Sequence, residues 1–206
     1  MNNLFSGTQE KTFYLWIDLN NPIVKHNFKI GSFVSSNFLP AKGEDHLMFL
    51  PNPNFSNFIS PFQMNLLNSY LAEYNLELSR RAFYKNYPNR LVATFLFDYK
   101  EEADKYKERN QELVKNRKLV KGKSFGNCIY SKHDLSWIDF LRLNGSKDQE
   151  TINNICKSYW EGKVVKECKL MHFGSEWSED SIFEILFYGK INFDKEEQKI
   201  IEESLK

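Results

Sequence analysis

One stretch in the last quarter of the chain, residues 177–190, constrains the fold more than any other. A polar, acidic turn runs directly into the apolar run 182–188, which is interrupted by a single carboxylate, Glu184. Branched and aromatic side chains favour a strand, and a strand that is apolar on both faces is usually covered on both sides. A glutamate there loses its water, which is costly unless the carboxylate is paired, hydrogen-bonded or used. The alternative is a glutamate on the wet face of an ordinary strand, since most glutamates are exposed.

Composition places the chain among globular proteins. Of the 206 residues, 41% are apolar and 16% aromatic, which is enough to bury a real core and excludes global disorder. Lys and Arg total 28 against 27 Asp and Glu, so the chain is no grossly basic nucleic-acid binder. The balanced net charge does not exclude a local basic patch. We expect one domain over residues 1–206, with residues 1–11 as a polar tail.

Cysteine and histidine spacing argues against a disulfide framework and a metal site. The three cysteines, Cys128, Cys156 and Cys168, are widely spaced, and the four histidines form no ligand pair. Cys128 could meet His133 or His172 as a nucleophile pair, although a small buried cysteine is the commoner case. No 18-residue apolar run occurs and the first residues are not signal-like. We therefore predict no metal, no membrane contact and a cytoplasmic location.

Hydrophobic periodicity predicts an α+β fold. Apolar residues recur at helical spacing over 62–84, and Asp148 precedes a second helical pattern. The expected helices are 62–84, 100–118, 135–141, 148–159 and a short terminal helix capped by Asp194. The expected strands are 12–18, 29–35, 91–97, 127–130, 164–170, 182–188 and 190–193. Pro22 is expected to stop the first strand in a turn, residues 36–61 to form a long loop, and residues 119–127 to form a turn region.

Common catalytic motifs are missing from the sequence. There is no P-loop, no glycine-rich dinucleotide fingerprint, no nucleophile elbow and no metal-ligand cluster. The chemistry still open needs only a positioned carboxylate and aromatic packing, or the chain is no enzyme.

Four short segments, in order, carry a resemblance to a known family. They are the Phe13-Tyr14 strand with the glycine-containing segment 29–35, the stretch 87–97 that holds Arg90, the stretch 130–137, and residues 159–162 followed by 183–189. In this order they resemble a bacterial family of unknown function that is similar to the ADP-ribosyltransferase superfamily. The resemblance covers most of residues 12–193.

The resemblance implies a split two-sheet β core with flanking helices and a cleft that binds NAD as substrate. Glu184 takes the place of the catalytic glutamate, which would orient the ribose and stabilise its developing positive charge. The candidate NAD-binding residues are Tyr14, Trp16, Arg90 and Arg80. Trp177, in the turn before Glu184, would lie beside the cleft and contact the acceptor. For Tyr14 and Trp16, which share one strand face, core packing is the equal alternative. For Arg90 the alternative is an anchor to a carboxylate such as Asp134.

The sequence departs from the family at two positions. Leu15 stands where the family usually has a histidine, so either Arg90 or Arg80 supplies that contact or the cleft binds NAD poorly. Ile182 stands where the arginine-directed subclass has a second acid, so arginine is not the predicted acceptor.

The predicted function is transfer of ADP-ribose from NAD to an intracellular macromolecule, a protein or RNA. By analogy, such a chain would be a toxin or a phage-defence effector with an antitoxin or inhibitor protein as partner. The first alternative is a catalytically degenerate binding module that acts through protein–protein contact. The second is a nucleic-acid-modifying enzyme that holds phosphates with Lys115, Arg117, Lys118, Lys121 and Lys123.

Overall fold

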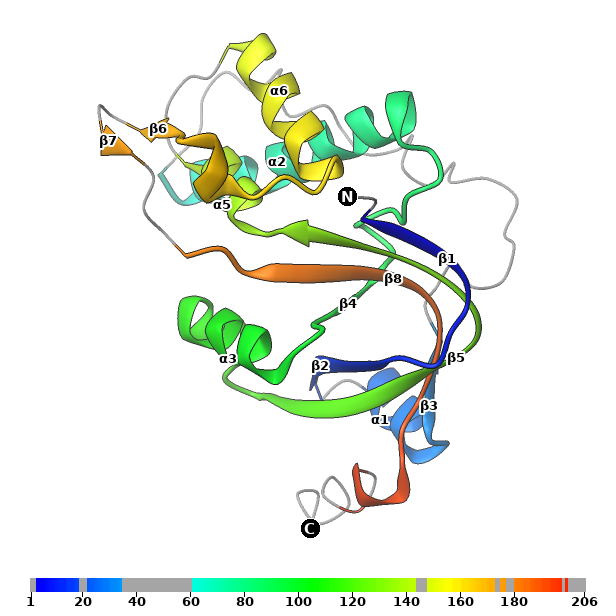
Figure 1. Cartoon of the computed structure of the whole chain (residues 1–206). Helices are drawn as coiled ribbons and strands as arrows, with labels where there is room; N and C mark the ends of the chain where they lie inside the picture. Colours follow the sequence, from blue (N-terminus) through cyan, green and yellow to red (C-terminus); the bar gives the residue numbers. More distant parts are fainter. Residues whose placement is uncertain are drawn as a thin grey trace.

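Two long strands, β5 (Arg117–Asp134) and β8 (Phe183–Asn192), run side by side through the sheet and bend together (Figure 1). The computed structural model describes residues 3–18, 22–34, 61–143, 148–172, 175–176, 180–197 and 199. Within these residues the fold is α+β, as predicted, with a six-stranded antiparallel sheet.

The shorter strands divide the sheet into two halves. β1 (Leu4–Thr8) pairs with the C-terminal half of β5, and β2 (Thr12–Asp18) pairs with its N-terminal half. β4 (Thr94–Leu96) and β3 (Ser32–Val34) divide β8 in the same way. The bend falls at a register shift in β5 where Gly126 has a φ of 74°, a conformation that favours glycine. Opposite it, a Cβ on Gly189 would lie 2.8 Å from Cys128 Cβ, so the two strands approach closely only because Gly189 has none.

The helices are arranged around this bent sheet (Figure 1). They are α1 (Pro22–Lys29), α2 (Pro61–Phe83), α3 (Lys100–Arg109), α4 (Gln111–Val114), α5 (Ser136–Arg142), α6 (Gln149–Trp160) and the 3₁₀ helix η3 (Val165–Cys168). α2, α5 and α6 pack together over one face of the sheet. A small hairpin of β6 (Met171–His172) and β7 (Ser175–Glu176) stands apart.

The two faces of the sheet bury two separate cores. On one face, Leu186 packs with α2, α5 and α6 in the helix-side core. On the other face, Phe13, Leu15 and Ile17 of β2 meet Ile185 of β8 in the strand core. The sheet curls far enough for the edges formed by β2 and β4 to meet. There the backbone N–H and C=O groups of Tyr14 and Phe97 bond to each other at 2.8 and 2.7 Å.

Several predicted elements are confirmed and others are wrong. The strand over 12–18 and the helices corresponding to α2, α5 and α6 are confirmed, and the side chain of Asp148 caps α6 by accepting from Thr151 N. Residues 4–8 of the predicted tail form β1, and Pro22 begins a helix, a position where its missing N–H costs nothing. The predicted strand 164–170 is η3. Residues 35–60, most of the predicted long loop, lie outside the described residues.

The largest error concerns the predicted turn region 119–127, which belongs to β5. Its glycines and lysines favour a turn locally, but β2 and β8 flank this segment and supply its hydrogen-bond partners. Gly122 is needed there, because a Cβ at this position would lie 2.4 Å from Ile191 Cγ2. The charged helix predicted over 100–118 correspondingly ends early, as α3 and α4.

Candidate functional site

Glu184 lies on β8 with its side chain on the helix-covered face of the sheet. Its neighbour Ile185 belongs to the strand core and Leu186 to the helix-side core, so β8 is covered on both faces, as predicted. Only 3% of Glu184 is exposed. The alternative of a glutamate on a wet strand face is therefore wrong.

Arg90, from the segment between α2 and β4, joins two carboxylates. Its Nη1 donates to Glu184 Oε1 and, at 2.7 Å, to the hydroxyl of Tyr159 on α6. Its Nε and Nη2 donate to the two carboxylate oxygens of Glu73 on α2, at 2.8 and 3.2 Å. The Tyr159 hydroxyl donates its own proton to Glu184 Oε1 at 2.7 Å. We call Glu73, Arg90, Tyr159 and Glu184 the Arg90 cluster.

The two oxygens of Glu184 are used differently. Both Arg90 and Tyr159 contact Oε1. From the part of the chain that the structure describes, Oε2 accepts no hydrogen bond. The carboxylate is thus held in a fixed orientation through one oxygen while the other keeps its acceptor capacity.

Burial and ion pairing shift the pKa values of the two carboxyl groups of the cluster in opposite directions. Burial raises the pKa of Glu184, and the attraction of Arg90 does not fully offset it. Burial would also raise the pKa of Glu73, but Arg90 and Arg142 hold it below its usual value. Burial raises the pKa of Tyr159 well above its ordinary value, so its hydroxyl keeps the proton that it donates. As the pH falls, Glu184 is therefore the first carboxyl of the cluster to take up a proton.

A pocket of about 360 Å³ opens onto the cluster. Glu73, Arg90 and Glu184 form its charged wall, and Asp139, Arg142 and Arg117 add further charges. Its aromatic walls come from β2, the β4 segment and α3, namely Trp16, Phe95, Phe97 and Tyr106. Arg142 Nε is enclosed and has no hydrogen-bond partner among the described residues, although the Arg142 side chain as a whole is 35% exposed.

Trp16 and Tyr14 share one face of β2, but only Trp16 lines this pocket. The Trp16 indole N–H donates to Ala103 O at 3.2 Å, which fixes the ring against α3. Tyr14 is half-buried beside the helix-side core and its backbone bonds to Phe97. Leu15 points the opposite way, into the strand core, with 3% exposed. Because side chains alternate along a strand, position 15, where the family usually has a histidine, faces away from the pocket that Trp16 lines.

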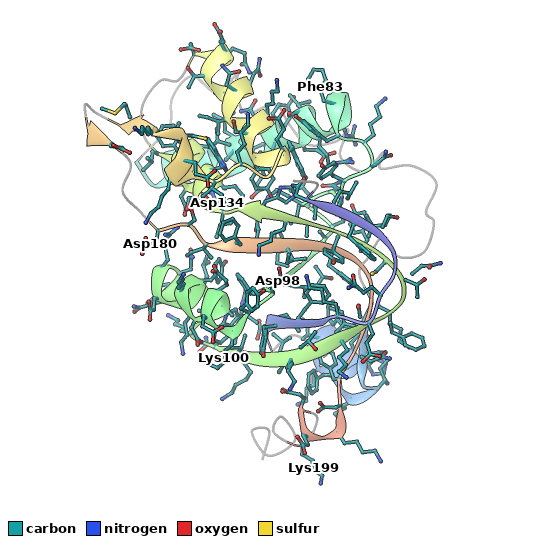
Figure 2. The ribbon with its side chains drawn as sticks, viewed as in Figure 1. Phe83, Asp98, Lys100, Asp134, Asp180 and Lys199 are labelled. Atoms are coloured by element: carbon teal, nitrogen blue, oxygen red, sulfur yellow. The ribbon has the colours of Figure 1, made fainter. Side chains whose placement is uncertain are left out.

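The remaining predicted site residues lie elsewhere. Arg80 is buried in an ion pair with Glu77 and donates to the carbonyls of Lys85 and Tyr87, at 3.2 and 3.1 Å, which ties the end of α2 to the following turn. It does not line the pocket. Trp177 lies outside the described residues. The alternative partner for Arg90, Asp134, sits at the end of β5 (Figure 2) and instead accepts from Ser136 N, Val165 N and Ser181 Oγ.

The five cations of the nucleic-acid alternative are exposed, and two of them are in ion pairs. Lys115 pairs with Glu112 at 2.6 Å and Lys123 with Glu10 at 2.9 Å. Arg117 is the one of the five that lines the pocket.

Sequence reasoning missed Glu73 and Tyr159 as members of the cluster. Both sit in apolar helical patterns, where an aromatic residue is usually read as core packing, and Tyr159 is indeed fully buried. Their polar atoms matter because they meet Arg90, which lies 17 and 69 residues away. No local spacing could have signalled these contacts.

His133 packs against the ring of Tyr159 and donates a hydrogen bond to its backbone carbonyl. Its ring stacks on the Tyr159 ring with centroids 4.3 Å apart. Because a carbonyl only accepts, Nδ1–H donates to Tyr159 O at 2.8 Å and Nε2 accepts from the Ser131 hydroxyl at 2.7 Å. Burial lowers the pKa of His133 to about 3, so the imidazole is neutral.

This buried histidine predicts a pH dependence of stability. Between its usual pKa of 6.5 and about 3, the unfolded chain binds a proton that the folded chain does not, so stability falls as the pH falls. The contribution is about 1.4 kcal/mol per pH unit. Urea unfolding should show that the free energy of unfolding falls less between pH 7 and pH 5 for His133→Phe than for the wild type. The exposed control His26→Phe should keep the wild-type slope, and equal slopes for all three would contradict the assignment.

Comparison with known proteins adds no relative. No protein-family model matches the sequence, and no curated protein matches it. Among the described residues, no helix is both long and apolar enough to cross a membrane. The same residues contain no group of three or more His, Cys, Asp and Glu side chains placed to hold a metal ion. The function is therefore inferred from the chemistry of the pocket.

Proposed function

We propose that the pocket binds NAD and that Glu184 supports cleavage of its glycosidic bond, with transfer of ADP-ribose to a macromolecular acceptor, a protein or RNA. The observation that carries the proposal is that only one of the two oxygens of the Glu184 carboxylate is hydrogen-bonded within the described residues. Oε1 of Glu184 is fixed by Arg90 and Tyr159, and Oε2 has no partner in the described part of the chain. Glu184 also lines the aromatic-walled pocket.

Glu184 has the chemistry that this reaction requires. Breaking the bond between nicotinamide and ribose develops positive charge on the sugar. A carboxylate that accepts a hydrogen bond from a ribose hydroxyl orients the sugar and stabilises that charge. Because Arg90 and Tyr159 already hold the carboxylate, little reorganisation is needed when charge develops.

The pocket fits one end of the dinucleotide. Its volume of about 360 Å³ is near the lower end of the range for ligand sites, roughly 300–1,000 Å³. It therefore suits the nicotinamide and its ribose, with Trp16 or Phe95 packing on the flat ring. Arg142 and Arg117 line the pocket and place positive charge where the diphosphate would follow. The rest of the molecule would extend beyond the pocket.

The fold is part of the same proposal. The order of the four resembling segments and the bent sheet, shared by two sets of strands, support an ADP-ribosyltransferase-like split β core. The resemblance assigned the contact missing at Leu15 to Arg80 or Arg90. Arg90 is the better candidate, because it lines the pocket and Arg80 does not.

One observation favours a second candidate, a binding module without catalysis. Arg90 and Tyr159 already engage Glu184, and only 3% of it is exposed. A carboxylate used only as an internal partner of Arg90 would build a rigid, aromatic-walled pocket for a protein side chain.

NAD labelled on the adenine ring separates the two candidates. Incubation of the pure protein with labelled NAD and separate protein and RNA pools should release nicotinamide and label one pool. A binding module would leave NAD intact in both incubations. If NAD is intact and calorimetry detects no NAD binding, the transferase proposal is wrong.

Trp16 should contribute to NAD binding and Tyr14 should not. Trp16→Ala removes an aromatic wall of the pocket and should weaken NAD binding at least tenfold, by the loss of ring packing worth about 1.5 kcal/mol. Tyr14→Ala is the matched control, because it truncates an aromatic residue on the same strand face outside the pocket. Calorimetric titration of NAD into both variants measures the difference, and equal affinities would remove Trp16 from the site.

A further inference from the structure

The strand that presents Glu184 to the pocket also lines a second groove on its other face. Phe183 and Ile185, the neighbours of Glu184, line a groove of about 690 Å³ that does not include Glu184. Ile185 also belongs to the strand core, so the floor of the groove is continuous with that core. Asp98, at the groove, lies between the upper and lower parts of the bent sheet (Figure 2).

At one side of the groove two lysines share one carboxylate, whereas its other charged residues, Glu161, Lys163 and Glu167, include the ion pair of Lys163 with Glu161 at 2.8 Å. Lys11 Nζ lies 2.5 Å from Asp98 Oδ1, and Lys132 Nζ donates to Asp98 Oδ2 at 3.2 Å. Asp98 can neutralise only one of the two ammonium groups. Lys132 stands on the sheet face that leads into the strand core, where an uncompensated charge is costly unless a partner satisfies it.

Hydrogen bonding within this trio is incomplete. Asp98 Oδ1 is enclosed, and its close contact is with the ammonium group of Lys11. Each ammonium group has three N–H donors, and Asp98 alone cannot satisfy all six. The side chains of Lys11 and Lys132 remain 30% and 36% exposed, so an anion can reach both.

Aromatic rings surround the two lysines. Lys11 Nζ lies 4.9 Å from the centroid of the Tyr130 ring, and Lys132 Nζ lies 5.0 Å from that of Phe183. Phe5 stacks on Tyr130 with centroids 4.8 Å apart. These contacts leave the rings of Phe5, Tyr130 and Phe183 half-buried in the groove lining, so a flat apolar body could pack on their remaining surface, which a small anion alone would not cover.

We infer that this groove is a second ligand site, which binds an aromatic anion with its carboxylate or phosphate at Lys11 and Lys132 and its ring against Tyr130 and Phe183. The groove combines apolar walls with convergent polar groups, as small-molecule sites do. The site is separate from the Arg90 cluster and does not depend on NAD chemistry.

Phenyl phosphate is the probe, because it combines one aromatic ring with a dianion. Titration into ¹⁵N-labelled protein, followed by NMR, should give saturable shifts at Tyr130, Lys132 and Phe183. Phenol and inorganic phosphate, which each lack one of the two parts, should bind at least tenfold more weakly. Shifts that do not saturate, or inorganic phosphate binding as tightly as phenyl phosphate, would overturn the proposal.

Variants locate the site and separate it from the proposed NAD pocket. Lys132→Met keeps the apolar stem and should weaken phenyl phosphate binding about tenfold, as expected for one lost charge-assisted hydrogen bond. Lys132→Arg keeps the charge and should retain most of the affinity. The control Lys115→Met removes an exposed lysine outside the groove, and Glu184→Gln alters the other pocket; both variants should bind phenyl phosphate as the wild type does. Unchanged binding by both Lys132→Met and Lys11→Met would overturn the proposal.

Discussion

Replacing Arg90 by methionine is expected to lower the free energy of unfolding by about 3–5 kcal/mol, the range for breaking a buried ion pair from one side. The guanidinium contacts two carboxylates and a tyrosine hydroxyl in a place where little water can substitute. Its removal would leave Glu73 and Glu184 as neighbouring carboxyl groups without their shared cation. Urea unfolding at pH 7 measures the loss.

Arg81→Met is the matched control for this prediction. Arg81 also pairs with a glutamate on α2, but it is 33% exposed, so its removal should cost less than about 1 kcal/mol. A loss for Arg90→Met as small as that for Arg81→Met would contradict the buried-pair description. The double variant Arg90→Met with Glu184→Gln should regain part of the stability, because the isolated carboxylate is then absent.

Lowering the pH should reduce the difference in the free energy of unfolding between the wild type and Arg90→Met. Arg90 is a main reason that the folded-state pKa of Glu73 lies below its usual value of 4.5. A carboxyl with a depressed pKa contributes stability above that usual value and loses it as the pH falls through the folded-state pKa. The wild type loses this contribution in acid, whereas the variant does not have it. A gap that stays constant from pH 7 to pH 3 would show that the ion pair is not its source.

The sequence could predict that Glu184 is buried and paired, because the evidence is local. A single carboxylate within an apolar run has to be paired or used, whatever the rest of the fold. Its partners could not be predicted in the same way. Arg90 lies 94 residues before Glu184 in the chain, and Tyr159 lies 25 residues before it. They meet only because α6 and the segment between α2 and β4 bring these side chains to the same face of β8.

The direction of side chains on β2 shows a different limit. Alternation correctly placed Tyr14 and Trp16 on one face, but which face meets the pocket depends on tertiary packing. The resemblance aligns Leu15 with the family's usual histidine, whereas the burial of Phe13, Leu15 and Ile17 together turns the Leu15 side chain into the strand core. The N-terminal half of β5 was missed for a related reason: its glycines and lysines are tolerated because two flanking strands supply its pairing.

Replacing Glu184 by glutamine should abolish most of the proposed transfer, by a factor on the order of 10² or more, as when an electrostatic contact to the transition state is lost. Glutamine keeps the shape of the side chain and an oxygen for Arg90 and Tyr159, but it lacks the negative charge that stabilises a developing cation. Folding should suffer less than in Arg90→Met, because Arg90 keeps Glu73 as its anionic partner.

Release of nicotinamide and labelling of the acceptor should be compared in the wild type and Glu184→Gln, with melting temperature as the control for folding. Binding of NAD should change far less than turnover if the charge acts mainly in the transition state. Full activity in Glu184→Gln would remove the carboxylate from the mechanism while leaving the NAD pocket in place. Equal losses of binding and turnover would instead make Glu184 a residue that builds the pocket, which is the role that the binding-module alternative gives it.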